Sequence, residues 1–509
     1  MTLSRPGCYR GVAREVPSGA NRQGPTPLLI PDEAEWLWAD VDRVLAPVTT
    51  PLGIVLALGV TGHVLLRKRE VAAATAWIGF AWIAPVWGAL FYFMFGINRV
   101  VRRAQKVRRP RQPRRGATDH PVHDIEAHLV PLERAIRRIT GRKAEHGNAV
   151  TVFHDGDEAY PVMLQAIAEA QGSVALSSYI MRHDRVGERF AQALKAAQDR
   201  GVAVRVLVDG IGSGYLSPIR RRLAALGVPV ALFMHSALPW RMPFLNLRSH
   251  KKLLVVDGTV GFTGGLNISD QNLLAERPAE PVADTHFRLE GPVVTQLMDV
   301  FAHDWTFTTG EEIAGESWFP DPDDRRAGDT LARVVTSGPD QDLEKIRSVL
   351  VEACACAQTS VKVMTPYFLP GAEVVSALTM AAMRGVRVDI VVPERSDHRF
   401  VDLAMRAHVA PLLEAGVRFW FGPAPFNHSK LMIVDGNWCL VGSANWDMRS
   451  LRLNFEMNVE LYDAGLAATL DAFILKHQAG GRLKLRDLNA RSLPVKLRDA
   501  AFRLLLPYI

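Results

Sequence analysis

Cysteine is scarce in this chain, with 4 among 509 residues. So few cysteines exclude a disulfide-framed secreted module and are typical of a reducing compartment. Cys354 and Cys356 lie in an apolar helical pattern, where we expect them to pack rather than to bind a metal. The chain also lacks the hydropathy of a polytopic transporter, since its mean hydropathy is only +0.04. Its length allows about two to four domains without a metal or a disulfide.

Acidic residues are missing from one stretch, and that stretch explains the charge of the whole chain. The sequence has 60 Lys and Arg against 53 Asp and Glu, a net charge of +7. Nine basic residues lie between Asn98 and Arg115, with no acidic residue among them. Without this stretch the chain would be slightly acidic. The excess is therefore local and does not indicate a general nucleic-acid-binding surface.

A long stretch without charge precedes the basic one. Residues 71–97 contain no charged side chain, and their length suits a tilted helix across a bilayer. Residues 45–66 form a second, weaker apolar segment, and only Arg67–Glu70 separates the two. We therefore predict a transmembrane hairpin over residues 45–97 and a basic linker over 98–125. The alternative is a pair of buried core helices.

The charges around this hairpin predict its orientation. Basic residues concentrate on the cytoplasmic side of membrane proteins, so the linker and everything beyond it should be cytoplasmic. Residues 1–44 should then form a cytoplasmic tail, and no signal-peptide pattern opens the sequence. The prediction is a multi-pass protein of the cytoplasmic membrane whose linker lies against anionic lipids.

Beyond the linker, strands and helices alternate, and the same order occurs twice. In the first copy an expected strand at 173–179 is followed by a helix through 187–199 and a strand at 201–209. In the second copy the ranges are 360–367, 373–383 and 384–392, and a Tyr ends the first strand of each copy. Apolar strands between amphipathic helices are typical of a sheet covered on both faces. We predict an α/β fold of two pseudo-symmetric lobes with a site between them.

Each copy ends in the same motif, H-x-K-x4-D-x6-G-[GS]-x-N. Its residues are His250, Lys252, Asp257, Gly264, Gly265 and Asn267 in the first copy, and His428, Lys430, Asp435, Gly442, Ser443 and Asn445 in the second. Positions i and i+2 of a strand share a face, so we expect each histidine and lysine to project together from a strand.

Two facing copies would place two histidines and two lysines around one small anion. Phosphoryl transfer without a metal needs this set: one histidine attacks phosphorus, the other protonates the leaving oxygen, and the cations hold the nonbridging oxygens. A single histidine near a strand end is usually structural, but two complete motifs at matching places are not a coincidence. Metal ligation is a poor alternative because no cysteine or carboxylate completes a ligand set. We predict neither a metal nor a cofactor.

The duplicated motif resembles that of the phospholipase D superfamily. The predicted hairpin, its exit Phe95–Arg99, and the segments Thr365–Pro370 and Asn445–Glu456 resemble the bacterial cardiolipin synthases within that superfamily. The resemblance runs from about residue 45 to the C-terminus. It implies two phospholipase D-like lobes, which we place at 126–325 and 326–490, and a location in the bacterial inner membrane.

The resemblance also implies a ping-pong reaction. One phosphatidylglycerol would lose glycerol to give a phosphatidyl-histidine, and a second phosphatidylglycerol would displace the histidine to give cardiolipin. The family pattern implies that His250 is the nucleophile and His428 the acid and base, although the pseudo-symmetry prevents spacing from deciding this. The implied phosphate-binding residues are Lys252, Lys430, Asn267, Asn445 and Ser443. The motif aspartates Asp257 and Asp435, counted with the catalytic set, should position the motif rather than touch substrate.

Family members place an acidic residue after each motif to orient the histidine. Here Asp284 fits the first motif and Glu456 the second, with a first loop longer by six residues. An exposed strand-end carboxylate is the alternative for Asp284. Gly265 departs from the family pattern, since it stands where Ser443 keeps the usual serine. The loss of a hydroxyl donor should weaken that half of the site.

Other functions remain open at this point. A hydrolase, or a transferase with another alcohol acceptor, would differ only in the second step. A nucleic-acid phosphodiesterase is disfavoured because the basic residues cluster beside the apolar segments, and a non-catalytic scaffold because both His-Lys pairs are complete. Phosphatidylglycerol and anionic lipids, not nucleic acid, are the expected partners. Residues 237–247 form either a lid or a buried connection, and the amphipathic tail 491–509 lies either in the membrane interface or on the second lobe.

Overall fold

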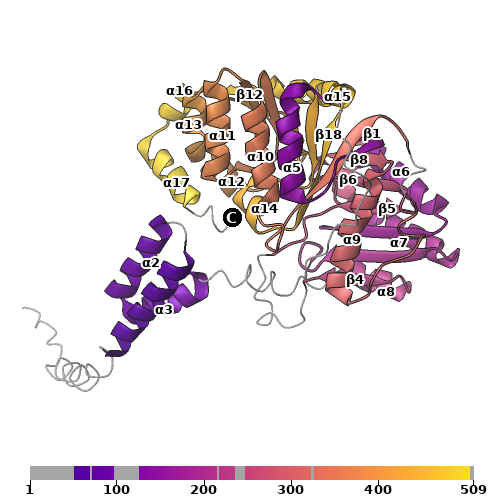
Figure 1. The fold of residues 1–509 in the computed structure, drawn as a ribbon, viewed down its shortest axis with the longest axis horizontal. Coiled ribbons are helices and arrows are strands. Elements are labelled where there is room, and N and C mark those ends of the chain that lie inside the picture. Colours follow the sequence, from indigo (N-terminus) through magenta and orange to yellow (C-terminus); the bar gives the residue numbers. More distant parts are fainter. Residues whose placement is uncertain are drawn as a thin grey trace, which may run out of the picture. The chain divides into compact units, whose positions relative to one another are not determined.

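The computed structural model describes residues 51–68, 71–96, 125–214, 217–234, 247–321 and 326–504, and Figure 1 shows their fold. The chain divides into two compact units, residues 1–98 and 99–509. The predicted tail 1–44, nearly all of the predicted linker 98–125 and all but the last residue of the segment 237–247 lie outside the described residues.

The first unit consists of short helices. Residues 51–67 are helical, and α2 (Val71–Ile83), α3 (Pro85–Phe91) and the π-helical turn η1 (Tyr92–Gly96) follow. The prediction of one continuous helix over 71–97 is wrong, because Ala84 leaves the helical region (φ −136°, ψ 78°) immediately before Pro85. A residue before proline is disfavoured in helical conformation, so the helix ends there and restarts. Among the described residues, no helix combines the length and apolarity needed to cross a membrane.

The helices of this unit pack through a small core. Val60, Val64, Ala81 and Tyr92 form its buried cluster. Close approach requires a glycine at position 88, because a Cβ there would lie 2.6 Å from the Cα of Ala81.

The second unit is built on one mixed sheet of 15 strands. From the middle outward, one half runs β1-β8-β6-β5-β2-β3-β4 and the other β9-β18-β16-β15-β10-β12-β13-β19. The first half contains β1 (Glu145–His154), β2 (Ser173–Ser178), β3 (Ala203–Asp209), β4 (Val230–Phe233), β5 (Leu253–Val256), β6 (Val260–Gly264) and β8 (Thr285–Glu290). The second contains β9 (Thr330–Ser337), β10 (Ser360–Met364), β12 (Arg387–Pro393), β13 (Arg418–Gly422), β15 (Leu431–Val434), β16 (Trp438–Gly442), β18 (Glu456–Tyr462) and β19 (Arg482–Leu483).

The two halves repeat the same topology. In each, the first strand of the repeat pairs in parallel with the next one (β2 with β3, β10 with β12) and antiparallel with the strand after the motif histidine (β5, β15). The halves join where β1 pairs antiparallel with β9, so they share one sheet. The repeat predicted from the sequence is confirmed.

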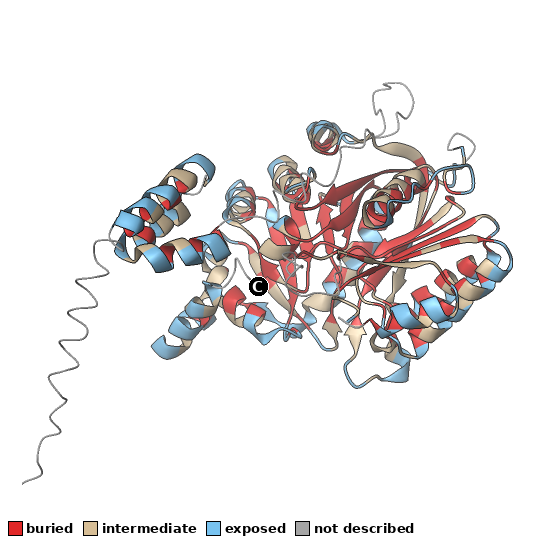
Figure 2. Cartoon of the chain, turned by 90° about the horizontal axis from the view of Figure 1, so that it is seen from below, coloured by how far each residue is buried: buried red, intermediate tan, exposed pale blue. Residues whose placement is uncertain are grey.

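Helices cover both faces of the sheet, as predicted. On one face, α6 (Asp155–Glu169), α7 (Arg185–Asp199) and α8 (Pro218–Ala225) pack on the first half, and α10 (Lys345–Cys356), α11 (Ala372–Met383) and α12 (Arg399–His408) on the second. On the other face, α9 (Val293–Thr309) and α15 (Ala464–Lys476) share one cluster that spans both halves. The strands are accordingly buried while the outer sides of the helices are exposed (Figure 2).

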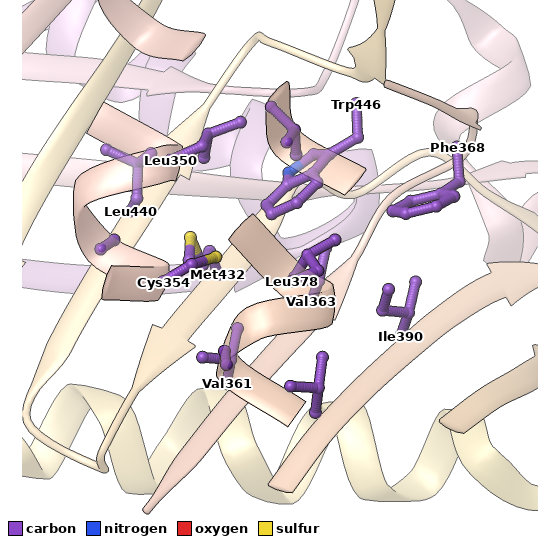
Figure 3. Packing of buried hydrophobic residues seen from close by; sticks show 14 of the residues in the cluster. Leu350, Cys354, Val361, Val363, Phe368, Leu378, Ile390, Met432, Leu440 and Trp446 are labelled. Atoms are coloured by element: carbon purple, nitrogen blue, oxygen red, sulfur yellow. The ribbon is translucent and has the colours of Figure 1, made fainter. Parts of the chain in front are cut away.

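The cluster under α10 shows this packing at close range. Leu350 and Cys354 of α10 lie over Val361 and Val363 of β10 and Met432 of β15 (Figure 3). Cys354 therefore has the packing role that its helical pattern predicted. The helix α5 (Val130–Thr140), within the range assigned to the first lobe, also joins this second-half cluster through Leu132 and Ile136.

The C-terminal helix α17 (Leu493–Arg503) packs on the second half. Phe502 contacts Phe400 of α12 with 5.0 Å between the ring centroids, and the buried Asp499 pairs with Arg491 and Arg498. Of the two alternatives for the tail, the described part lies on the second lobe.

The remaining elements are short. They are β7 (Val282–Ala283), β11 (Phe368–Leu369), β14 (Phe426–Asn427), β17 (Trp446–Asp447), α13 (Ala410–Glu414), α14 (Met448–Arg452), α16 (Leu485–Asn489) and the 3-10 turns η2 (Ala127–Leu129), η4 (Asp270–Asn272), η5 (Leu274–Glu276) and η6 (His477–Gly480).

Candidate active site

The backbone ties each histidine motif to the opposite lobe. Ser249 forms a parallel bridge with Phe455, and the His250 amide donates to the Phe455 carbonyl at 2.9 Å. In the other direction, β14 pairs with β7, and the His428 amide donates to the Ala283 carbonyl at 2.7 Å. Each motif is thus anchored to the residues just before the acidic residue of the other lobe.

The two histidines meet on the pseudo-twofold axis. Their ring centroids lie 6.2 Å apart with the planes at 81°, and both side chains are buried. Contrary to the prediction, neither His-Lys pair lies on a strand. Both pairs sit in the extended segments immediately before β5 and β15, because these segments leave the sheet to reach across the lobe boundary.

Each histidine is oriented by the acid of the other lobe. His250 Nδ1 lies 3.1 Å from Glu456 Oε2, and His428 Nδ1 lies 2.9 Å from Asp284 Oδ2. The sequence-based pairing of Asp284 with the first motif and Glu456 with the second is wrong in this respect. The crossed bridges at Phe455 and Ala283 are the physical reason. Since Nδ1 of each ring faces a carboxylate, Nε2 is the nitrogen left for chemistry.

Opposing charges keep both carboxylates ionised. Burial raises the pKa of Asp284, but Lys430 and His428 outweigh it and hold the pKa below its usual value. Burial likewise raises the pKa of Glu456, and His250 and Lys252 more than compensate. Two anions, each against one imidazole, are the arrangement that stabilises an imidazolium when it forms.

The two lysines hold the positive charge of the site. Lys252 Nζ donates to the His250 carbonyl at 2.7 Å and lies 5.1 Å from the centre of the Tyr179 ring. Lys430 Nζ lies 2.6 Å from His428 Nδ1 and also donates to the His428 carbonyl. Burial, together with the neighbouring Lys430, lowers the pKa of Lys252 to about 7, and burial lowers the pKa of Lys430 to about 8.

Both histidines are held neutral in the free enzyme. Burial lowers the pKa of His250, and burial with Lys430 lowers the pKa of His428 to about 4. A neutral imidazole is the form that attacks phosphorus, and a bound phosphodiester anion would raise the pKa of the partner histidine again by Coulomb attraction.

The motif aspartates lie away from the histidines. Asp257 accepts from the backbone amides of Gln171, Gly172 and Ser173 at 2.7–2.9 Å, and Asp435 accepts from those of residues 358–360 at 2.8 Å. Each thereby ties the turn after its motif strand to the start of the neighbouring strand. Their placement in the catalytic set is corrected, and the positioning role expected from the resemblance fits the geometry.

The asparagines and Ser443 differ from one another. Asn267 accepts from the Ile180 amide at 3.3 Å, whereas the buried Asn445 Oδ1 makes no hydrogen bond within the described residues. Ser443 Oγ donates to Glu456 Oε2 at 2.6 Å. Its hydroxyl therefore binds the orienting carboxylate, and its role as a phosphate ligand stays a prediction.

Two tyrosines that were not predicted as site residues lie beside the histidines. The Tyr179 ring lies 4.8 Å from the His250 ring, and Tyr367 lies 6.2 Å from His428. Tyr367 donates to Asp397 at 2.5 Å. The sequence signal was present, because a tyrosine ends each expected first strand, and in the structure the two tyrosines follow β2 and β10.

This duplicated fold, with two crossed His-Lys-carboxylate half-sites on one axis, defines a phospholipase D-like phosphotransfer enzyme. The family model described as cardiolipin synthase, PLD-like domain, matches residues 163–305 and 350–477. The chain belongs to this family of phospholipase D-like cardiolipin synthases.

Individual relatives agree with that assignment. A cardiolipin synthase of Geobacillus kaustophilus is 31% identical over 87% of this chain and 90% of its own length. Cardiolipin synthase 2 of Staphylococcus epidermidis is 30% identical over 88% of this chain and 94% of its own length. A crystal structure of phosphatidylserine synthase from Haemophilus influenzae covers 74% of this chain and 100% of its own, with a TM-score of 0.58 and 14% identity, which is a similarity of fold.

Proposed function

We propose that this chain is a cardiolipin synthase that transfers a phosphatidyl group from one phosphatidylglycerol to another and releases glycerol. The observation that carries the proposal is the pair of neutral, buried histidines 6.2 Å apart, each with an ionised carboxylate on Nδ1. The relatives named above, which align with 87% and 88% of this chain, support the choice of lipid substrate.

The reaction follows from these groups. Nε2 of one histidine attacks phosphorus with its lone pair, the bond from phosphorus to the glycerol oxygen breaks, and the other histidine gives that oxygen its proton. A hydroxyl of the second phosphatidylglycerol then loses its proton to the same histidine and attacks phosphorus, which breaks the phosphorus–nitrogen bond. Lys252, Lys430 and Asn445 would hold the nonbridging oxygens. The family pattern favours His250 as the attacking group.

The experiment uses the full chain in vesicles of labelled phosphatidylglycerol. We expect equal amounts of glycerol and cardiolipin, without added nucleotide or metal. Phosphatidic acid as the only lipid product would instead identify a hydrolase. Acid quenching during turnover followed by peptide mapping should locate the phosphatidyl adduct on His250 or His428 and so assign the nucleophile.

We also propose that the first unit is a membrane hairpin placing the catalytic unit on the cytoplasmic side of the bacterial inner membrane. Large apolar side chains on its outer surface support this, including exposed Leu58, Leu66, Val71, Ile83 and Trp87. Its polar groups pair with one another, as a lipid environment requires: His63 Nδ1 lies 2.6 Å from Tyr92 Oη, and Trp82 Nε1 donates to Thr61 Oγ1 at 3.1 Å.

Two measurements test the hairpin. An inserted hairpin should stay in the membrane pellet after alkaline carbonate washing, and single cysteines placed in the catalytic unit should react with impermeant reagents only after the inner membrane is opened. Release by carbonate would contradict the membrane proposal but would leave the proposed reaction unaffected.

A further inference from the structure

The surroundings of the two site tyrosines break the pseudo-symmetry of the site. Arg248 precedes the first motif by two residues, and Arg449 follows the second motif asparagine by four. The corresponding positions of the other half are Phe426 and Gln271, which carry no charge. The two-histidine reaction uses equivalent groups from both halves and does not require an arginine pair in one half alone. The pair therefore points to a second ligand.

The backbone brings the two arginines together. The Arg248 carbonyl accepts from the Phe455 amide at 2.8 Å, and the Arg449 carbonyl accepts from the adjoining Asn454 amide at 3.0 Å. His250 is bound to the same Phe455, so both arginines border the half-site of His250. Tyr179, which lies against the His250 ring, feels the field of both guanidinium groups.

Among the described residues, neither Arg248 nor Arg449 forms an ion pair with a nearby carboxylate. Both side chains are half-buried, and the hydrogen bonds of the Arg248 guanidinium go to uncharged groups, the Leu247 carbonyl at 3.1 Å and Tyr179. Asp209 is the acid whose field reaches Arg248, but its carboxylate accepts from the Ile211, Gly212 and Ser249 amides. Asp447 faces Arg449, yet it caps α14 through the Ser450 amide, and burial raises its pKa to about 6.

The opposite half-site carries the reverse charge. Tyr367 lies beside Asp397, to which it donates. A phosphate would be repelled there and attracted at the arginines. A donor phosphate between the histidines leaves the arginine side as the place for a second anionic headgroup, and guanidinium groups bind phosphate strongly.

We propose that Arg248 and Arg449 form a subsite for the phosphate of the acceptor phospholipid. The subsite deepens the proposed synthase function and rests on it. By holding the acceptor phosphate beside Tyr179, it presents the free glycerol hydroxyl to the phosphatidyl-histidine. It thereby selects a phosphate-bearing alcohol over water or free glycerol.

The test compares two acceptors on the full-length protein. Cardiolipin formation uses the anionic acceptor, and exchange of labelled free glycerol into phosphatidylglycerol uses a neutral one. We expect Arg248→Gln and Arg449→Gln each to lower the ratio of cardiolipin formation to glycerol exchange about tenfold, with more phosphatidic acid from water. Lysine at either position should restore part of the ratio.

Arg452→Gln is the matched control, because Arg452 lies on the same helix α14 but pairs with Glu344 at 3.0 Å. It should leave the ratio unchanged. Equal loss of both activities in the arginine variants, or an unchanged ratio, would overturn the subsite. A wild-type chain that forms no cardiolipin would overturn the synthase proposal itself, which is a separate result visible before any variant is made. The lysine variants keep the test decisive if a glutamine variant does not fold.

Discussion

The two half-sites reach the same chemistry with different residues. In one, Glu456 orients His250 and takes a second hydrogen bond from Ser443. In the other, the shorter Asp284 orients His428, and position 265 is glycine. A Cβ at Gly265 would lie 2.0 Å from Asp284 Oδ1, so no serine fits there while Asp284 keeps its place. Gly265 is therefore matched to Asp284, and the weakening expected from the missing hydroxyl stays a prediction.

The two motif lysines also contact their histidines differently. Lys252 bonds the carbonyl of its histidine, whereas Lys430 also crowds Nδ1 of His428. The pKa of His428 falls to about 4 as a result of burial and this lysine. Pseudo-symmetry thus fixes which groups are present, while local packing decides how basic each one is.

Removing either histidine should cause the largest loss of activity. His250→Ala and His428→Ala should each lower cardiolipin formation by about 10⁴-fold or more, because the nucleophile and the proton carrier act as one unit. Assays of lipid product in membranes check this. His183→Ala, at an exposed histidine outside the site, is the control and should keep full activity. A single histidine variant with substantial activity would contradict the two-histidine mechanism.

Replacing Gly265, which is matched to Asp284, should have the next largest effect on activity. Gly265→Ser should push Asp284 away from His428 and lower kcat about 100-fold, since small misplacements of catalytic groups have effects of that order. Gly265→Ala gives the same overlap without a hydroxyl and should behave alike. If serine at 265 raised activity instead, the family serine would be a true donor and the matched-pair interpretation would fail.

The opposite change should be milder. Ser443→Ala removes one hydrogen bond from Glu456 but leaves its contact with His250, so we expect about a tenfold fall in kcat with little change in KM. Kinetics over a range of phosphatidylglycerol concentrations separates the two constants. A large rise in KM with kcat intact would instead support the predicted role of Ser443 as a phosphate ligand.

The sequence predicted the members of the site better than their partners. Two motifs at fixed spacing identified the histidines and lysines, and the strand pattern predicted the repeated sheet. The crossing of Asp284 and Glu456 could not be read from spacing, because it depends on β7–β14 pairing and the bridge at Phe455 between distant segments. The break at Ala84 was readable from Pro85, but the uncharged run around it favoured a single helix.

The smallest expected effect concerns the pKa difference between the two lysines, which the pH dependence of activity should reveal. With its pKa lowered to about 7, Lys252 of the free enzyme loses its charge as pH rises through 7, and Lys430 follows near 8. The value of kcat/KM reports the free enzyme, so it should fall several-fold between pH 7 and 8.5, while kcat changes less because a bound phosphate raises both pKa values. Arginine stays protonated in this range, so Lys252→Arg should move the fall upward, toward the pKa of Lys430. A variant with an unmoved pH profile would show that Lys252 is already fully charged without substrate, and the proposed difference between the two lysines would then disappear.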